Sequence, residues 1–428
     1  MNAPSFRIAL RYWFVLGCIS FGGPAGQIAM MHRELVERRR WISDGHFLHA
    51  LNFCMLLPGP EAQQLATYLG WRLHGLRGAL AAGVLFVLPS AVLLYALSWM
   101  FMTSAGIGWV AAIFGGLLPA VVALVISAVI RIGRKALKTR ALLALAAAAF
   151  VAVSYLKVPF VIVVAAAAII GAVGRRFVPA MFPAADGHKG GQAAELECVS
   201  LPPVPVNSWR RVCMILVVGL VVWWSVPLAL GAWLGWGHAV FAQGIFFSKA
   251  ALVTFGGAYA VLPYVAEQAV QTHGWLSQSQ MMSGLALAET TPGPLIMVLQ
   301  FVGYVGAWQH PGTLSPHVAA TLGALVTTWV TFTPGILMIL LGAPHVETLR
   351  SRPLIAAALA AITAAVVGVI LNLGIWMAWR VISPSGTLDV FAAVCTVLAL
   401  LALQRKTTNP AWVIAACAAA GLVRYAVA

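Results

Sequence analysis

Four short motifs of glycine and proline interrupt long apolar stretches of this sequence, and the backbone itself could do chemistry there. They are residues 21–24, 58–60, 255–257 and 292–294. Glycine and proline are expected inside an apolar helix only where the helix breaks. A helix that begins at such a break presents unpaired backbone N–H groups and the positive end of its dipole. Four such helix starts predict an anion-binding site; the alternative is that these residues only permit kinks or close helix packing.

Three ionisable residues are expected deep within the interrupted segments: Glu61, Lys249 and Glu289. Charges inside a membrane are costly, and they suggest a function. Lys249 could balance a bound anion or pair with a glutamate, and Glu61 could carry a proton or only cap its own helix. The hydroxyls of Thr290 and Thr291 could donate to an oxyanion or merely to backbone carbonyls.

Several amide side chains are further candidates, and each could equally hold two helices together. They are Gln27, Asn52, Gln63, Gln64 and Gln300. The sequence contains no zinc, phosphate-loop or hydrolase signature, so we expect no metal, no cofactor and no enzymatic activity. The candidate substrate-binding residues are Gly22, Gly23, Pro24, Gln27, Asn52, Pro58, Gly59, Pro60, Glu61, Gln64, Lys249, Gly256, Gly257, Glu289, Thr290, Thr291, Pro292, Gly293 and Pro294.

The composition indicates what kind of element positions these residues. Hydrophobic residues make up 61% of the chain and charged residues 9%, and the mean hydropathy is +0.93. These values exclude a water-soluble domain. Several apolar runs exceed the ~20 residues that a helix needs to cross a bilayer, and the short alternating segments of a β-barrel are missing. The expected fold is all-α, a polytopic helical protein within a lipid bilayer.

The sequence also contains an internal repeat. The motif at 58–60 recurs 234 residues later at 292–294, and the motif at 21–23 recurs on the same register. Trp41 and Trp275 are related in the same way. After an insertion in the second half, the register becomes 245. Such identities on a fixed register predict two duplicated halves.

The distribution of charge predicts how the halves are oriented. The net charge is +15, and 22 of the 26 Lys and Arg residues can be placed on one side of a membrane. This is the positive-inside pattern, so no nucleic acid partner is needed to explain the charge. Residues 31–40 contain four arginines whereas 265–274 contain none, and the uncharged loop 103–108 corresponds to the basic loop 345–353. The reversal predicts inverted-topology repeats, with the N-terminus and the central linker in the cytoplasm.

We therefore expect an N-terminal transporter repeat at 1–176, a cytoplasmic linker at 177–209 and an inverted C-terminal repeat at 210–428, with its core at about 241–428. The short segments beside the breaks are expected to be re-entrant hairpins or broken helices that meet near the midplane. The expected helical segments are 6–20, 24–38, 46–57, 61–71, 79–101, 109–130, 141–154, 160–174, 212–230, 319–342, 354–378, 388–403 and 410–424.

The motifs resemble those of a known family. Residues 21–24, 41–43 and especially the run 52–65 are similar to the chromate ion transporter (CHR) family in its two-repeat form. The similarity continues at 255–257 and 291–294 and covers nearly the whole chain. It implies a bacterial inner-membrane secondary transporter that exports chromate and confers chromate resistance, with sulfate as a competing analogue.

One departure from a symmetrical arrangement is that Val15 is the counterpart of Lys249, so a pair of equivalent basic ligands is not expected. An anion uptake carrier, of the sulfate type, or an anion channel with the same architecture are the alternatives. Protons and a second copy of the chain are left open as partners.

Overall fold

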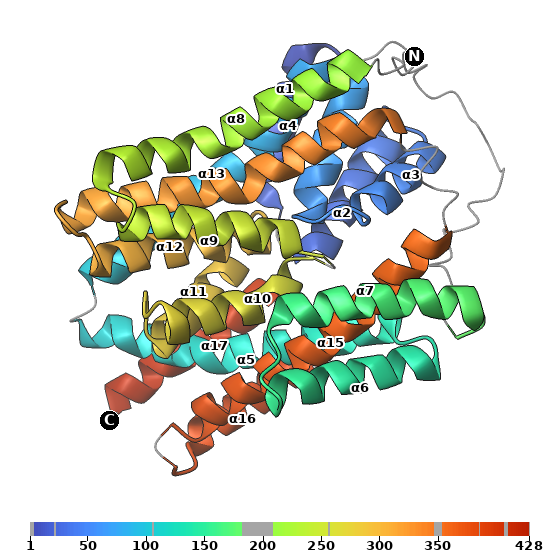
Figure 1. The fold of residues 1–428 in the computed structure, drawn as a ribbon. Coiled ribbons are helices and arrows are strands. Elements are labelled where there is room, and N and C mark those ends of the chain that lie inside the picture. The colour runs from blue at the N-terminus through green and yellow to red at the C-terminus, as the bar shows by residue number, and fades with distance from the viewer. Residues whose placement is uncertain are drawn as a thin grey trace.

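The computed structural model describes residues 4–20, 23–104, 107–181, 209–255, 257–345, 353–384, 386–405 and 410–427. These residues are mostly helical and contain no β-strand, as predicted (Figure 1). A helix suits such apolar runs because it satisfies its own backbone hydrogen bonds where no water can. Most of the expected central linker lies outside the described residues.

The helices of the first half are α1 (Phe6–Ile19), α2 (Gly23–His32), α3 (Asp44–Cys54), α4 (Glu61–Thr103), α5 (Gly108–Ala136), α6 (Arg140–Ser154) and α7 (Phe160–Phe177). α4 contains a kink, because His74 and Gly75 have non-helical dihedral angles and the φ of Gly75 is 62°. The part of α4 before this kink reaches only about 20 Å, which is too short to cross a hydrocarbon core of about 30 Å. α3 and this part of α4 are therefore two short legs on either side of residues 58–60.

The helices of the second half are α8 (Trp209–Leu234), α9 (Ala239–Val253), α10 (Ala258–Glu267), α11 (Gln278–Thr290), α12 (Val298–Gln309), α13 (Pro316–Gly342), α15 (Pro353–Ile382), α16 (Val390–Gln404) and α17 (Pro410–Val427). Short 3₁₀ turns, Leu295–Met297 and Ala343–His345, precede α12 and follow α13. From α9 onwards, the helices follow one another in the same order as in the first half. Each predicted segment overlaps an observed helix.

The sequence analysis did not predict that two of these helices end as π-helices. α2 continues as the π-helix Arg33–Arg38, and α10 continues as the π-helix Gln268–Thr272. The two π-helices occupy corresponding positions of the two halves. π-helices are rare and often occur at functional sites.

Seven helices of the described residues are long and apolar enough to cross a membrane. They are α4, α5, α7, α8, α13, α15 and α17. The chain is thus a polytopic helical membrane protein, as its composition predicts.

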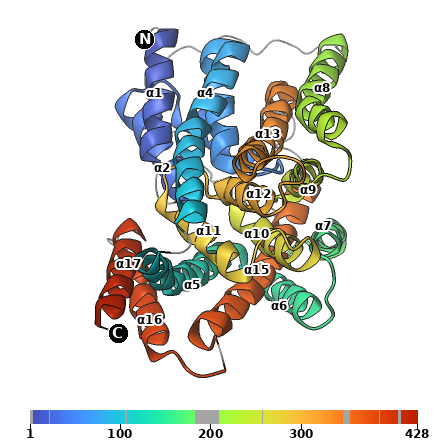
Figure 2. The ribbon, with the colours of Figure 1, turned by 90° about the vertical axis from the view of Figure 1, so that its left-hand side faces the viewer.

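The two halves exchange their packing partners. α5 packs against α16 and α17 of the second half, and α15 packs against α6 and α7 of the first (Figure 2). Glycines allow the close approach: a Cβ atom on Gly116 of α5 would meet the backbone of Gly421 in α17, and one on Gly368 of α15 would meet the backbone of Ala146 in α6. Small residues serve the same purpose at helix contacts in other membrane proteins.

Two aromatic rings flank the guanidinium of Arg39 at the end of the first π-helix. We call Arg39, Tyr12 and Trp41 the first aromatic bracket. The guanidinium of Arg39 lies 4.9 Å from the ring centroid of Trp41 and 5.4 Å from that of Tyr12. Arg39 also donates a 2.7 Å hydrogen bond to Glu34. This bond holds the pKa of the Glu34 carboxyl below its ordinary value. A permanent cation therefore joins the π-helix to α1 and to the connection that leads to α3.

The corresponding bracket of the second half contains a histidine. His273 stacks on Trp275 with ring centroids 4.3 Å apart, and it lies 5.7 Å from Phe246. These residues lie 234 positions after Arg39, Trp41 and Tyr12. Burial, and after it the charge of Lys249, lower the pKa of His273, so its imidazole is uncharged at neutral pH.

Candidate anion site at the helix breaks

The four breaks share a backbone conformation that only glycine adopts readily. Gly23, Gly59, Gly257 and Gly293 have φ values of 68°, 123°, 90° and 107°. An L side chain is strained at such angles, whereas glycine is not. The breaks are thus built into the sequence, as predicted. Gly22 and Gly256, two other predicted site residues, lie outside the described residues.

Two backbone hydrogen bonds cross between the halves at these breaks. The N–H of Gly59 donates to the carbonyl of Thr254 over 2.7 Å, and the N–H of Gly293 donates to the carbonyl of Ser20 over 2.9 Å. Ser20 ends α1 and Thr254 ends α9. Each donor and each acceptor lies 234 residues from its counterpart, so the two contacts exchange when the halves are exchanged. The two contacts thus correspond to each other in sequence position.

The N-termini of three helices at the breaks have no side-chain cap and are buried. Pro60 precedes α4, Gly257 precedes α10 and Pro294 precedes the 3₁₀ turn before α12. α1, α5, α7 and α13 also lack a side-chain cap, but the residues that precede them are exposed, where water can accept the hydrogen bonds. A buried N-terminus without a cap needs another acceptor, and an anion meets that need.

Buried glutamine amides surround the crossing bonds. Gln27 Nε2 donates to the carbonyl of Gly293 over 2.5 Å and to that of Ser20 over 3.2 Å. Gln64 Nε2 donates to the carbonyl of Pro58 over 2.7 Å. The amide of Gln63 is buried with no hydrogen-bond partner among the described residues. An unpaired buried amide costs free energy, and a ligand that accepts a hydrogen bond from Gln63 Nε2 would remove this cost.

Two carboxylates flank the start of α10, where the helix dipole favours negative charge. Glu61 is half-buried, and its Oε1 lies 3.7 Å from the position a Cβ atom on Gly257 would take. Glu289, also half-buried, accepts a 2.5 Å hydrogen bond from the hydroxyl of Tyr259 in the first turn of α10. The sequence analysis missed Tyr259, because nothing in the order of residues indicates that α10 lies beside the end of α11.

Some predicted ligands lie elsewhere or already have partners. The side chain of Lys249 is exposed on α9 rather than buried at a break, and that of Asn52 is exposed on α3. The hydroxyls of Thr290 and Thr291 donate to the carbonyls of Leu287 and Ala288. These hydroxyls therefore serve the backbone, which was one of the two roles predicted for them.

Gln300 also serves to connect helices. Its Nε2 donates a 2.9 Å hydrogen bond from α12 to the carbonyl of Ala91 in α4. This bond gives Gln300 the role of interhelical contact that the sequence analysis named as one of two possibilities.

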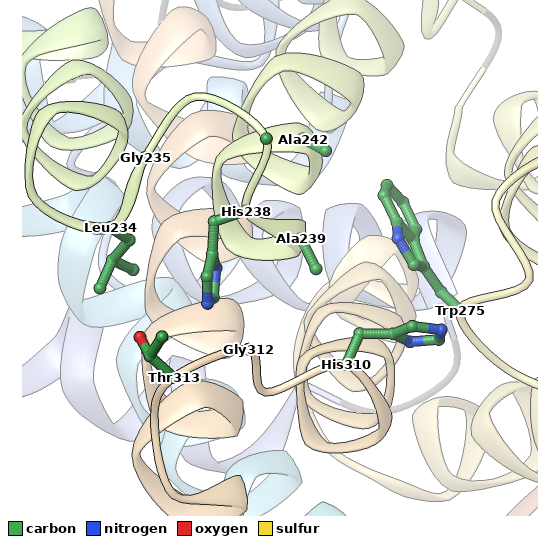
Figure 3. Close-up of a pocket in the computed structure, with 10 residues that line it drawn as sticks. Leu234, Gly235, His238, Ala239, Ala242, Trp275, His310, Gly312 and Thr313 are labelled. Carbon is green, nitrogen blue, oxygen red and sulfur yellow. The ribbon is translucent and has the colours of Figure 1, made fainter.

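A cavity of about 660 Å³ lies away from the breaks, between the loop that joins α8 to α9 and the loop that joins α12 to α13 (Figure 3). His238, Trp275 and His310 line it, and none of the predicted site residues does. His238 is fully bonded: its Nδ1 accepts from the N–H of Val240 and its Nε2 donates to the carbonyl of Pro311. No residue with a permanent charge lines this cavity, so the helix breaks remain the candidate anion site.

The comparisons with known proteins identify the family of the chain. The sequence model of the family described as Chromate transporter matches residues 8–172 and 241–422, and these ranges include all four breaks. The chain belongs to the chromate transporter family. It is 33% identical to the chromate transport protein of Pseudomonas aeruginosa over 95% of this chain and 89% of that protein.

Two further members are similar over most of their length. The chromate transport protein of Cupriavidus metallidurans is 29% identical over 99% of this chain and 95% of its own. The probable chromate transport protein of Synechococcus elongatus is 28% identical over 86% of this chain and 83% of its own. No solved structure matches this chain. The chain is thus a multi-pass membrane protein of a family of transport proteins.

Proposed function

We propose that this protein is a secondary transporter that exports chromate across the inner membrane of a bacterium and so confers chromate resistance. The observation that carries the proposal is the set of three buried, uncapped N-termini before Glu61, Ala258 and Leu295. A tetrahedral dianion supplies several acceptor oxygens to such donors at once. The names of the relatives supply the identity of the anion. Sulfate, which has the same shape and charge, is expected to compete.

Export of this dianion needs no coupled proton. With the cytoplasm negative, each charge that leaves gains about 2.3 kcal/mol per 100 mV, so a dianion gains about 4.6 kcal/mol. This gain sustains a concentration ratio of about a thousand. The membrane potential alone is thus a sufficient driving force.

The proposed architecture is two inverted repeats around the breaks. The crossing bonds of Gly59 and Gly293, and the reciprocal packing of α5 and α15, support a two-fold relation between residues 1–176 and 210–428. The reversed charge of corresponding loops supports a two-fold axis in the membrane plane, with the N-terminus and residues 177–209 in the cytoplasm. The breaks then lie near the midplane, where substrate sites of such transporters occur.

Everted membrane vesicles test the direction and the driving force. Labelled chromate should accumulate inside vesicles that contain the protein when the lumen is made positive, and an imposed pH gradient alone should have no effect. Vesicles without the protein are the control. Accumulation that needs a pH gradient would contradict the potential-driven mechanism, and accumulation only in right-side-out vesicles would indicate an uptake carrier.

A counterflow experiment distinguishes a carrier from a channel. Vesicles loaded with unlabelled chromate should take up labelled chromate faster than empty ones, because a carrier exchanges its substrate. A conductance without counterflow would overturn the carrier assignment in favour of a channel.

A further inference from the structure

Ser90 is a buried serine of α4, and its hydroxyl has no hydrogen-bond partner among the described residues. Many serines and threonines within these helices donate to the carbonyl four residues earlier, as the hydroxyl of Ser98 does to Leu94 over 2.7 Å. An unpaired hydroxyl inside a protein costs free energy. Ser90 thus lacks the structural role of Ser98, and its hydroxyl is available to a ligand.

The hydroxyl of Ser90 lies against the break at 292–294. Its Oγ is 2.6 Å from the position that a Cβ atom on Gly293 would take. Because Gly293 has no side chain, Ser90 can lie directly against the backbone of the break. α4 packs against α1, α2 and the turn that precedes α12, so Ser90 lies where the first half meets the break of the second (Figure 2).

Two residues that bond to the same break also have unpaired polar atoms. Ser20 accepts the N–H of Gly293 with its carbonyl, and its own hydroxyl has no described partner. Gln27 Nε2 donates to the carbonyls of Gly293 and Ser20, while its Oε1 has no described partner. Ser20, Gln27 and Ser90 are each fully buried. Gln27 thus engages two carbonyl oxygens that would repel an anion, and the two serine hydroxyls remain as donors.

The corresponding break of the first half has a different arrangement. Gln64 Nε2 lies 2.8 Å from the Cβ position of Gly59, and it donates to the carbonyl of Pro58. On the register of 245, the counterpart of Ser90 is Gly335, which has no side chain to donate. The donor that faces Gly59 is therefore bonded to the break itself, whereas the donor that faces the second break is unbonded.

We propose that Ser90 is a substrate ligand that donates a hydrogen bond to a tetrahedral oxyanion at the break 292–294. The inference rests on the proposed function and deepens it, because it names a side chain that binds the anion beside the backbone donors. A hydroxyl rotates to suit its acceptor, and hydrogen bonds to a charged acceptor are stronger than neutral ones. The uncapped turn Leu295–Met297 supplies backbone N–H groups next to it. The bound anion gives the Ser90 hydroxyl the partner that it lacks.

Thermal unfolding in detergent, with and without chromate, tests this role. Ser90→Ala removes an unpaired group, so the substrate-free variant should unfold at the temperature of the parent or above it. The same change removes a contact with the anion, so about tenfold more chromate should be needed for the same rise in unfolding temperature. A purely structural hydroxyl would not produce this combination.

Ser98→Ala is the matched control. It removes an equally buried hydroxyl from the same helix, but one that bonds to its own helix. The substrate-free control should therefore unfold at a lower temperature than the parent, and its response to chromate should equal that of the parent.

Uptake into everted vesicles measures the same contact during transport. The KM for chromate should rise about tenfold in Ser90→Ala and stay at the parent value in Ser98→Ala. Ser90→Cys keeps the shape of the side chain with a weaker donor, so its KM should lie between those of the parent and Ser90→Ala. If Ser90→Ala does not insert, Ser90→Cys decides, and a KM equal to that of the parent would then overturn the role of Ser90.

The outcomes separate this inference from the proposed function. A parent protein that neither transports chromate nor is stabilised by it would contradict the proposed function, and sulfate then replaces chromate as the probe of Ser90. Stabilisation by neither anion would overturn both proposals. An unchanged KM in Ser90→Ala would overturn the role of Ser90 alone. If the substrate-free variant also unfolds at a lower temperature, the hydroxyl binds a structural water instead.

Discussion

The backbone N–H of Gly59 donates a 2.7 Å hydrogen bond to the carbonyl of Thr254, in the other half of the chain. In this bond and in its counterpart from Gly293 to Ser20, the residue that ends one helix accepts a hydrogen bond from a break in the other half of the chain. The sequence analysis expected the helix that begins at each break to present unpaired N–H groups. The two bonded N–H groups lie within the breaks, before α4 and before the turn Leu295–Met297, so they leave the donors of the first turn after each break to an anion.

Gly59→Val should abolish chromate transport while the protein still inserts. The φ of Gly59 is 123°, and a Cβ atom there would approach Gln64 Nε2 to 2.8 Å. The strain and the clash, each of the order of 1–2 kcal/mol, act where the halves meet. Gly386→Val is the matched control, because Gly386 also has a positive φ, of 80°, but has no atom near its Cβ position. Transport and membrane abundance are measured together. Normal transport in Gly59→Val would make the break a packing device only.

Glu61→Gln should leave the KM for chromate unchanged or lower it severalfold. The substitution removes a negative charge from the place where we expect the dianion, so repulsion is lost. Glu37→Gln removes an exposed carboxylate from the π-helix, away from the breaks, and should have no effect. The measurement is initial uptake against chromate concentration. A raised KM in Glu61→Gln but not in Glu37→Gln would indicate that Glu61 stabilises the structure of the break.

Lys249→Gln should change the KM for chromate less than twofold. Its side chain is exposed on α9, so a bound anion at the breaks would feel its charge only through a screened path. The parent protein in the same everted vesicles provides the comparison. A tenfold rise in the KM of Lys249→Gln would indicate that Lys249 binds the anion, as the sequence alone suggests.

Cysteine labelling tests the proposed orientation. Gln271 and Thr313 are exposed in the second half, and Ala180 is exposed just after α7. In a variant without the six native cysteines, Gln271→Cys and Thr313→Cys should react with an impermeant maleimide in spheroplasts, and Ala180→Cys only after lysis. Labelling of Ala180→Cys before lysis would contradict the inverted arrangement.

Glu34→Gln should lower the free energy of unfolding by about 0.5–1 kcal/mol at pH 7, since it removes the negative charge from an exposed hydrogen-bonded pair with Arg39. The folded pKa of Glu34 lies below the ordinary value of 4.5, so its stabilisation is complete above that pH and is lost as the pH falls through the folded pKa. Thermal unfolding in detergent at pH 7 and pH 3 measures the difference. A double variant with Arg39→Gln isolates the pair; a difference that does not become smaller as the pH is lowered below 4.5 would contradict the assignment.

The sequence was sufficient to predict the helices and the breaks, because both depend on local features. Apolar length sets the crossings, and Gly59 and Gly293 interrupt an apolar run whatever surrounds them. The partners of those breaks depend on contacts between residues more than 190 positions apart, such as Gly59 with Thr254, which no local pattern contains. The exposure of Lys249 could not be predicted either, because the apolar residues of α9 are spread around the helix and define no outward face.

The change from Arg39 to His273 within otherwise similar aromatic brackets bears on the biosynthesis of the protein. In the proposed orientation, the loop around His273, which leads to α11, must be carried across the membrane during insertion. The loop around Arg39, which leads to α3, stays in the cytoplasm. Translocation of an arginine through the membrane centre costs about 2.5–3.5 kcal/mol on insertion scales. His273 can make the passage as a neutral imidazole and afterwards stack on Trp275 as Arg39 does on Trp41. In the proposed orientation, the bracket thus keeps its aromatic contacts in a loop that crosses the membrane during insertion.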